Sequence, residues 1–312
     1  MHSIKRKFHG KILLFGEYSV ILGSMALAIP YRKVSAWLQF PGNSRVNSQA
    51  VESNQTLGKF AVYLSEIREK IPELLGIDVL RFQADIGNGL YLESTIPGKY
   101  GLGSSGALCA AVYGAYGSKP GNPDPQVNGP GLRRLFAGME SFFHGSSSGI
   151  DPLCIYTDTP LIIQSADFVR PWVPTRDLIS GMVIFLVDTR QPGQTGKLVN
   201  NFRQQMEDPR QRESFTEDYI PLVNMAVGEL VHGRLQYETI KNLSYSQLNH
   251  LSSMIPEGFL DTWRKGLEKD LFACKLCGSG GGGMMLGFTP EFSKARKFLL
   301  KNFNCSPEIL KL

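Results

Sequence analysis

The chain has 312 residues, a length that predicts about two domains. Its 33 basic and 28 acidic residues give a net charge of +5, too small for a nucleic-acid scaffold with clustered lysine and arginine. A hydrophobic content of 42% with 20% charged residues is typical of a globular protein and excludes wholesale disorder.

Neither a secretory signal nor a membrane span is predicted. Lys11 and Glu17 interrupt the first apolar stretch, and no window has the ~18–20 apolar residues that a span needs. The five cysteines are few and odd in number, which favours a reducing compartment and predicts a cytoplasmic protein. Cys274 and Cys277 form one C-x-x-C pair. A redox or metal site there is the alternative to small residues beside a glycine loop, but no second pair completes a metal set.

Hydrophobic periodicity predicts the elements of the first half of the chain. In order, these are strands at 11–15 and 26–40, a helix at 59–76 broken near Pro72, a strand pair at 78–94, a helix from Ser104 to Tyr116, a loop at 117–131, a helix at 132–143 and a strand at 160–164.

The second half is predicted to add more helix than strand. In order, we expect a strand at 182–188, helices around 197–207, 216–231 and 258–269, a strand, a glycine loop, the strand GGMMLGF and a last helix from Pro290. A boundary near residue 175 divides the chain into predicted domains 1–175 and 176–312. The mixture of hairpins and segregated helices predicts an α+β fold rather than regular βαβ alternation.

The strongest local signal is a glycine-rich loop that runs directly into the helix expected at Ser104. It reads Pro97, Gly98, Lys99, Tyr100, Gly101, Leu102, Gly103, Ser104, Ser105 and Gly106. The first N–H groups of a helix lack intrahelical partners and lie at the positive end of its dipole, so they bind phosphates. Glycines let the backbone approach a ligand, and serine hydroxyls add donors or ligate Mg²⁺. A tight turn capped by serine is the alternative.

Two glycine patterns invite other interpretations. Residues 101–106 satisfy G-x-G-x-x-G, which occurs in dinucleotide-binding folds, but residues 278–283 satisfy it as well, so the pattern is weak. Four consecutive glycines at 280–283 cost much backbone entropy between apolar strands. We expect this second loop to pack against phosphate or against the first loop, rather than to act as a flexible linker.

Two carboxylates flank a polar turn. Glu140 lies near the end of a predicted helix, and Asp151 follows the turn after it. One such carboxylate can hold a metal while the other handles a proton. A solvated glutamate and a capping aspartate are the alternative, and His144 is interpreted as a helix-end residue rather than a ligand.

These three segments and the opening KILLFGEY resemble, in this order, the GHMP small-molecule kinase superfamily, and within it the mevalonate kinase group. The resemblance extends from GKILLFGEYSVILG to KLCGSGGGG, and GLGSSGA and HGSSSGID are its most specific motifs. It implies an α+β fold with a ribosomal-S5-domain-2-like N-terminal domain and a ferredoxin-like C-terminal domain. It also implies an ATP- and Mg²⁺-dependent kinase, with conversion of mevalonate to 5-phosphomevalonate for isoprenoid synthesis as the expected reaction.

The resemblance also implies roles for residues that match the family motifs. Asp151 matches the catalytic aspartate, and Lys11 matches the lysine that lowers the pKa of the substrate hydroxyl. Ser105 and Glu140 match the Mg²⁺ ligands, and residues 97–106 match the ATP phosphate loop, supported by Gly278, Gly280 and Gly281. The residues expected at the acceptor are Lys11, Glu17, Asp151 and Thr195.

The sequence departs from the family pattern at three positions, which leaves the acceptor open. His9 and Ser147 stand where the family has proline, and Tyr18 stands where it usually has histidine. A phosphomevalonate kinase or a sugar kinase of the same superfamily is therefore the alternative.

Two further expectations concern charge and partners. A phosphorylated acceptor would need extra cations near the cleft, for which Lys99, Arg190 and Lys197 are available. A non-catalytic nucleotide-binding regulator is the alternative from another class of protein. Such a regulator is expected to have lost the lysine or the aspartate of the catalytic positions, whereas this sequence has both Lys11 and Asp151. We expect a small alcohol as the partner, no nucleic acid or membrane, and a monomer or homodimer.

Overall fold

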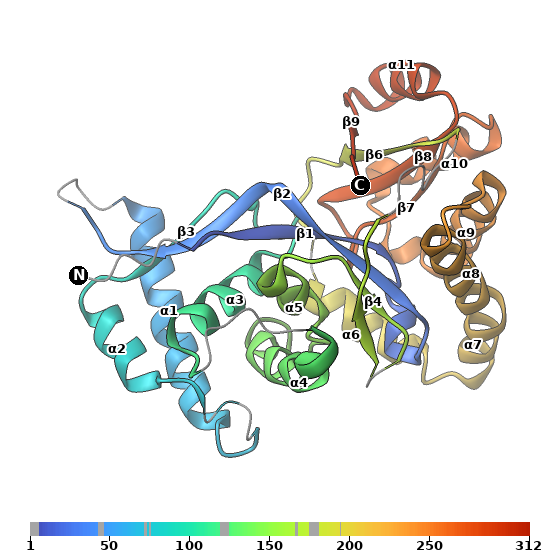
Figure 1. Cartoon of the computed structure of the whole chain (residues 1–312). Coiled ribbons are helices and arrows are strands. Elements are labelled where there is room, and N and C mark those ends of the chain that lie inside the picture. Colours follow the sequence, from blue (N-terminus) through green and yellow to red (C-terminus); the bar gives the residue numbers. More distant parts are fainter. Residues whose placement is uncertain are drawn as a thin grey trace.

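The computed structural model of the chain describes residues 6–42, 47–71, 74, 76–118, 125–165, 168–174, 181–193 and 195–312, and for residues 125–130 and 195 it describes the backbone alone. Helices and antiparallel sheets are mixed as predicted for an α+β fold (Figure 1). No helix in these ranges is long and apolar enough to cross a membrane. The predicted boundary near residue 175 lies outside the described residues.

Within the described ranges, the first sheet has five strands, built around one long strand. The strands are β1 (Phe8–Phe15), β2 (Ala26–Gln39), β3 (Tyr91–Ser94), β4 (Leu161–Ile163) and β5 (Val169–Pro171). β2 pairs antiparallel with β1, β3 and β4, and β5 pairs with β4.

The helices of this half cover the first sheet, and several of them contain predicted site residues. Helices α3 (Ser104–Tyr116) and α5 (Ile150–Thr157) pack against β1 and β2 (Figure 1). Helix α4 (Pro125–His144) packs against α3 and α5. Helices α1 (Ser48–Ile67) and α2 (Val79–Gly87) lie toward the end of the sheet that holds β3. Two helix N-termini, those of α3 and α5, therefore lie beside β1.

The second sheet has the order β7-β8-β6-β9 in the described part of the chain. Its strands are β6 (Val183–Asp188), β7 (Ala273–Leu276), β8 (Met284–Thr289) and β9 (Glu308–Ile309), all antiparallel. With helices between β6 and β7 and between β8 and β9, this order is that of a ferredoxin-like sheet, as predicted.

The helices of this half are α6 (Thr195–Gln205), α7 (Pro209–Ser214), a π-helical turn (Phe215–Tyr219), α8 (Ile220–Val231), α9 (Tyr237–His250), α10 (Glu257–Glu268) and α11 (Phe292–Phe303). They surround the second sheet in Figure 1, except α6, which lies under the first sheet beside α4. A 3-10 turn at Ser19–Leu22 (η1) follows β1, and another at Ser252–Met254 (η4) follows α9.

The predicted strand pair at 78–94 is wrong in its first part, because residues 79–87 form α2. The Asp78 side chain accepts a hydrogen bond from the Arg81 N–H, and Val79 and Phe82 are buried three residues apart. This cap and this spacing stabilise a helical turn instead of alternating strand faces.

Several predicted bounds also differ. α1 begins at Ser48 rather than at residue 59, because the side chain of Asn47 caps the helix there. α4 begins at Pro125, inside the predicted loop. α5 and α9 have no counterpart in the prediction. The last helix begins at Phe292, and Thr289 accepts from the Glu291 N–H just before it, so Pro290 precedes the helix.

Candidate active site

The first glycine-rich loop leads into α3 as predicted. Gly103 adopts φ 83° just before the helix, and a Cβ there would lie 3.0 Å from Cγ of Lys11. The Lys11 N–H donates to the Leu102 carbonyl at 3.0 Å, which ties β1 to the loop. Ser104 and Ser105 therefore lie half-buried in the first turn of α3, where a helix offers unpaired N–H groups to an anion.

The second glycine loop packs against the first, which confirms one of the two predicted arrangements. Gly101 has φ +76°, and a Cβ there would overlap the Cys277 carbonyl oxygen. Gly283 lies against Tyr100 in the same way, and the Met284 N–H donates to the Tyr100 carbonyl at 3.2 Å. Side chains at these glycines would push the two loops apart.

Gly280 and Gly281 contact a different part of the chain. The Gly281 N–H donates to the Met254 carbonyl of η4 at 2.6 Å, and a Cβ on Gly280 would overlap that carbonyl. Gly278 instead lines the cavity described below. The structure thus brings one of these three predicted residues to the cavity.

Lys11 and Asp151 form an ion pair at the centre of the site. Lys11 Nζ lies 2.8 Å from Asp151 Oδ2, and the lysine side chain is 2% exposed whereas the aspartate is 30% exposed. Burial lowers the pKa of Lys11, but the surrounding acidic groups, Asp151 foremost, together outweigh burial, so the pKa of Lys11 is raised. Asp151 lies in the first turn of α5, where the helix dipole also favours a carboxylate.

Glu140 accepts hydrogen bonds from two serines. Ser105 Oγ donates to Glu140 Oε1 at 2.8 Å, and Ser147 Oγ donates to Oε2 at 2.5 Å. Burial, with the charge of nearby Asp151, raises the pKa of Glu140 to about 7. His144 Nε2 lies 3.1 Å from Ser105 Oγ, so this helix-end histidine is part of the cluster. Ser147, at a position where the family has proline, thus helps to orient Glu140.

Glu17 and Tyr18 connect the first half of the chain to the second. Glu17 Oε1 forms a buried ion pair with Lys275 of β7, and the Tyr18 hydroxyl donates to the Ser279 carbonyl of the second glycine loop. Glu17 Oε2 is buried and has no hydrogen-bond partner among the described residues. Burial raises the pKa of Glu17, and Lys275 opposes that effect.

These groups surround a cavity of about 160 Å³, here called the Lys11 cavity. Its lining includes Lys11 and Glu17, Glu140 and His144 of α4, Asp151 of α5, and Arg203 of α6. Side chains from both halves of the chain therefore converge on one space beside the N-terminus of α3.

Several candidates lie elsewhere. Gly98 and Lys99 are exposed, and neither of them nor Arg190 or Lys197 lines the Lys11 cavity. The side chain of Thr195, the first residue of α6, is outside the described part of the chain.

The sequence did not indicate the roles of Lys275 and Arg203. Lys275 lies in an apolar strand and pairs with Glu17, which is 258 positions away in the chain. Arg203 reaches the cavity from α6, the helix that begins at the predicted acceptor residue Thr195. Lys275 stands at the start of the KLCGSGGGG motif, but that motif does not indicate its pairing with Glu17.

A divalent cation fits the donors at Glu140. Mg²⁺ prefers oxygen ligands and is bound by one or two carboxylates together with substrate phosphates. The carboxylate of Glu140 and the hydroxyl of Ser105 are such donors, beside a helix N-terminus suited to phosphates. The described residues hold no cluster of three or more His, Cys, Asp or Glu side chains that could bind a metal alone. The site therefore fits a metal that arrives with a phosphorylated ligand.

The chain is similar to known proteins in sequence and in fold. Residues 63–158 match the model of the GHMP kinases N terminal domain. The chain is 28% identical to a mevalonate kinase of Thermococcus onnurineus, over 90% of this chain and 87% of the relative.

Two solved structures share the fold at low sequence identity. Streptococcus pneumoniae phosphomevalonate kinase in complex with phosphomevalonate and AMPPNP superposes with a TM-score of 0.64 at 17% identity, covering 98% of each chain. L. major mevalonate kinase in complex with R-mevalonate gives 0.62 at 16% identity, covering 96% of this chain and 90% of that one. Residues 63–158 thus match the N-terminal domain of the GHMP kinases, and the chain shares the α+β fold of these two structures.

Proposed function

We propose that the protein transfers the γ-phosphoryl group of ATP to the C5 hydroxyl of mevalonate, with Mg²⁺ as cofactor. The observation that carries this proposal is the convergence of two pairs, Lys11–Asp151 and Ser105–Glu140, beside the N-terminus of α3. Phosphoryl transfer needs mainly positioning and electrostatic stabilisation, and these pairs supply a cation, a base and metal ligands in one place.

Each group has a role in this reaction. The loop 97–106 and the first turn of α3 bind the phosphates of ATP through backbone N–H groups. Asp151 orients the acceptor hydroxyl and accepts its proton as the oxygen attacks phosphorus, while ADP leaves. Lys11, held charged by Asp151, favours the alkoxide and neutralises the transferring charge.

Glu140 and Ser105 would hold the metal. Mg²⁺, when bound, neutralises charge on the phosphates of ATP. Ser147 and Ser105 orient the Glu140 carboxylate, which burial would otherwise favour in its protonated form.

Mevalonate is favoured as the acceptor by two observations. The relatives that match nearly the whole chain are named mevalonate kinases. A phosphorylated acceptor would call for several cations at the cavity, yet Lys99, Arg190 and Lys197 do not line it, which leaves Arg203 as the described lining cation besides Lys11. Arg190 instead donates a hydrogen bond to the Asn304 carbonyl.

Coupled measurement of ADP release tests the proposal. Purified protein with ATP and Mg²⁺ is assayed with mevalonate, phosphomevalonate, galactose and homoserine. We expect mevalonate to give the highest kcat/KM. Preferential turnover of phosphomevalonate, galactose or homoserine would reject mevalonate as the acceptor, and the absence of ADP release with all four compounds would reject the proposal.

A further inference from the structure

The residue after Glu17 lies at the centre of a strained turn. Tyr18 has φ 60° and ψ −47°, and across it the Ser19 N–H donates to the Glu17 carbonyl at 2.6 Å. A hydrogen bond between residues two apart, with positive φ at the residue between them, defines the rare and strained form of the γ-turn. Such strain persists only where the surrounding structure holds it, and it is concentrated at functional sites. The contacts that hold Tyr18 are therefore candidates for a functional role.

Contacts on both sides of Tyr18 hold this turn in place. Before it, Glu17 is fixed by its buried ion pair with β7. After it, the Ser24 N–H donates to the Ser19 carbonyl at 3.1 Å, and Ser24 Oγ donates to Ser19 Oγ at 2.7 Å. Tyr18 itself is 5% exposed, and its hydroxyl donates to the Ser279 carbonyl. The strained turn thus directs the tyrosine hydroxyl at the second glycine loop.

This hydrogen bond joins the Lys11 cavity to the two glycine loops. Tyr18 and Ser279 both line the cavity. Two positions before Ser279, the carbonyl oxygen of Cys277 lies against Gly101 of the first glycine-rich loop, for which we propose phosphate binding. Burial raises the pKa of Tyr18, so its hydroxyl stays protonated and remains a donor. A movement of Tyr18 at the cavity would therefore be transmitted to the first loop through the second.

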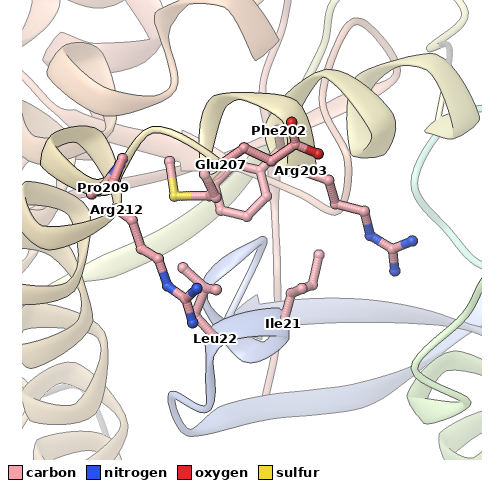
Figure 2. A pocket seen from close by; sticks show the side chains of 8 residues that line it. Ile21, Leu22, Phe202, Arg203, Glu207, Pro209 and Arg212 are labelled. Carbon is pink, nitrogen blue, oxygen red and sulfur yellow. The ribbon is translucent and has the colours of Figure 1, made fainter.

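The 3-10 turn η1 begins directly after Tyr18 and borders a second cavity. This side cavity has a volume of about 450 Å³, with Ile21 and Leu22 of η1 on one side and residues of α6 that include Phe202 on the other (Figure 2). Ile21 also lines the Lys11 cavity, so η1 lies between the two spaces. Because a cavity offers no packed neighbours to displace, the strained turn can relax toward it without steric cost.

We propose that Tyr18 is a positioning residue that couples acceptor binding to ATP binding. An acceptor that fills the Lys11 cavity packs against Tyr18 and holds the strained turn, so the hydroxyl keeps the second glycine loop against the first. With the cavity empty, η1 relaxes toward the side cavity and the hydrogen bond to Ser279 is lost. The acceptor therefore strengthens ATP binding, and ATP strengthens acceptor binding by the same factor. This inference rests on the proposed function, since it concerns the two substrates of that reaction.

The test compares Tyr18→Phe with the wild type by calorimetry of AMPPNP binding, without and with saturating mevalonate. Phenylalanine keeps the ring, whose centroid lies 4.8 Å from that of Phe202, and removes only the hydroxyl. Tyr31→Phe is the matched control, because the Tyr31 hydroxyl also joins the two halves of the chain. It donates to Glu308 Oε1 of β9 at 3.0 Å, and Tyr31 does not line the Lys11 cavity.

The decisive quantity is the Kd of AMPPNP without mevalonate divided by its Kd with mevalonate. This ratio should be about fivefold or more in the wild type and in Tyr31→Phe, and it should fall to about one in Tyr18→Phe. At saturating mevalonate, Tyr18→Phe should raise KM for ATP about twofold to tenfold, the usual worth of a hydrogen bond, with little change in kcat.

Three results would overturn the role of Tyr18 and leave the proposed function intact. They are a ratio near one in the wild type, a ratio in Tyr18→Phe equal to that of the wild type, and an equal loss in Tyr31→Phe. The last would mean that any link between the two halves has the same effect. A wild type that does not phosphorylate mevalonate overturns both the coupling and the proposed function.

Discussion

The buried ion pair between Lys275 and Glu17 links the second sheet to the turn after β1. Their side chains are 0% and 1% exposed, and the second carboxylate oxygen of Glu17 already has no hydrogen-bond partner among the described residues. Replacing Lys275 by Met would leave the buried carboxylate without its ion-pair partner. Loss of one partner of a buried pair costs ~3–5 kcal/mol, so we expect Lys275→Met to lower the free energy of unfolding by about that much at pH 8.

The loss of unfolding free energy in Lys275→Met, here called the deficit, should become smaller as the pH is lowered. Burial raises the pKa of Glu17 even with Lys275 present, and loss of the ammonium should raise it further. A carboxyl with a raised folded-state pKa stabilises the fold below its unfolded pKa, and this contribution is lost as pH rises through the folded pKa. Lowering the pH from 8 to 5 should therefore reduce the deficit of Lys275→Met, because Glu17 becomes protonated.

Urea titrations at pH 8 and pH 5 measure the effect. Lys294→Met is the matched control, since Lys294 pairs with Glu291 on the surface, where the side chains are 60% and 58% exposed. An exposed pair contributes ~0–1 kcal/mol. A deficit for Lys275→Met no larger than that of Lys294→Met, or one that does not change with pH, would refute the reasoning.

Two further variants test the metal and the loops. Glu140→Gln should raise the Mg²⁺ concentration needed for half-maximal activity by about tenfold or more, measured by metal titration at fixed ATP, and an unchanged requirement would contradict the assignment. Gly101→Ala should cost about 1–3 kcal/mol in urea titration and weaken ATP binding in calorimetry, because Gly101 has φ +76° and its Cβ would overlap the Cys277 carbonyl. Gly42→Ala is the control, since Gly42 lies outside this loop and no atom lies within 4 Å of its Cβ, and equal losses in both variants would reject the loop contact.

The elements next to the motifs were predictable because their signals are local. The run of small residues after Gly103 predicted a helix from Ser104 to Tyr116, and α3 has these bounds. The apolar stretches of β6 and β8 were equally clear. Residues 79–87 were assigned to a strand because three-residue spacing and alternation are hard to separate in so short a run.

The contacts that complete the candidate site were not predictable in this way. The motifs placed Lys11, Ser105, Glu140 and Asp151 together, but the pairing of Lys275 with Glu17 depends on how the two sheets meet. Sequence reasoning looked for anion-binding cations close to the motifs, whereas the structure places Arg203 of α6 at the cavity. The position of Arg203 along the sequence does not show that its side chain borders this cavity.

The turnover of Asp151→Asn tests the central claim most directly. This variant keeps the size of the side chain but removes the carboxylate that pairs with Lys11. With mevalonate and ATP, kcat should fall by about 10²–10⁴-fold, the usual contribution of a general base, while calorimetry gives an ATP affinity close to that of the wild type. An Asp151→Asn protein that turns over mevalonate at the wild-type rate would contradict the account.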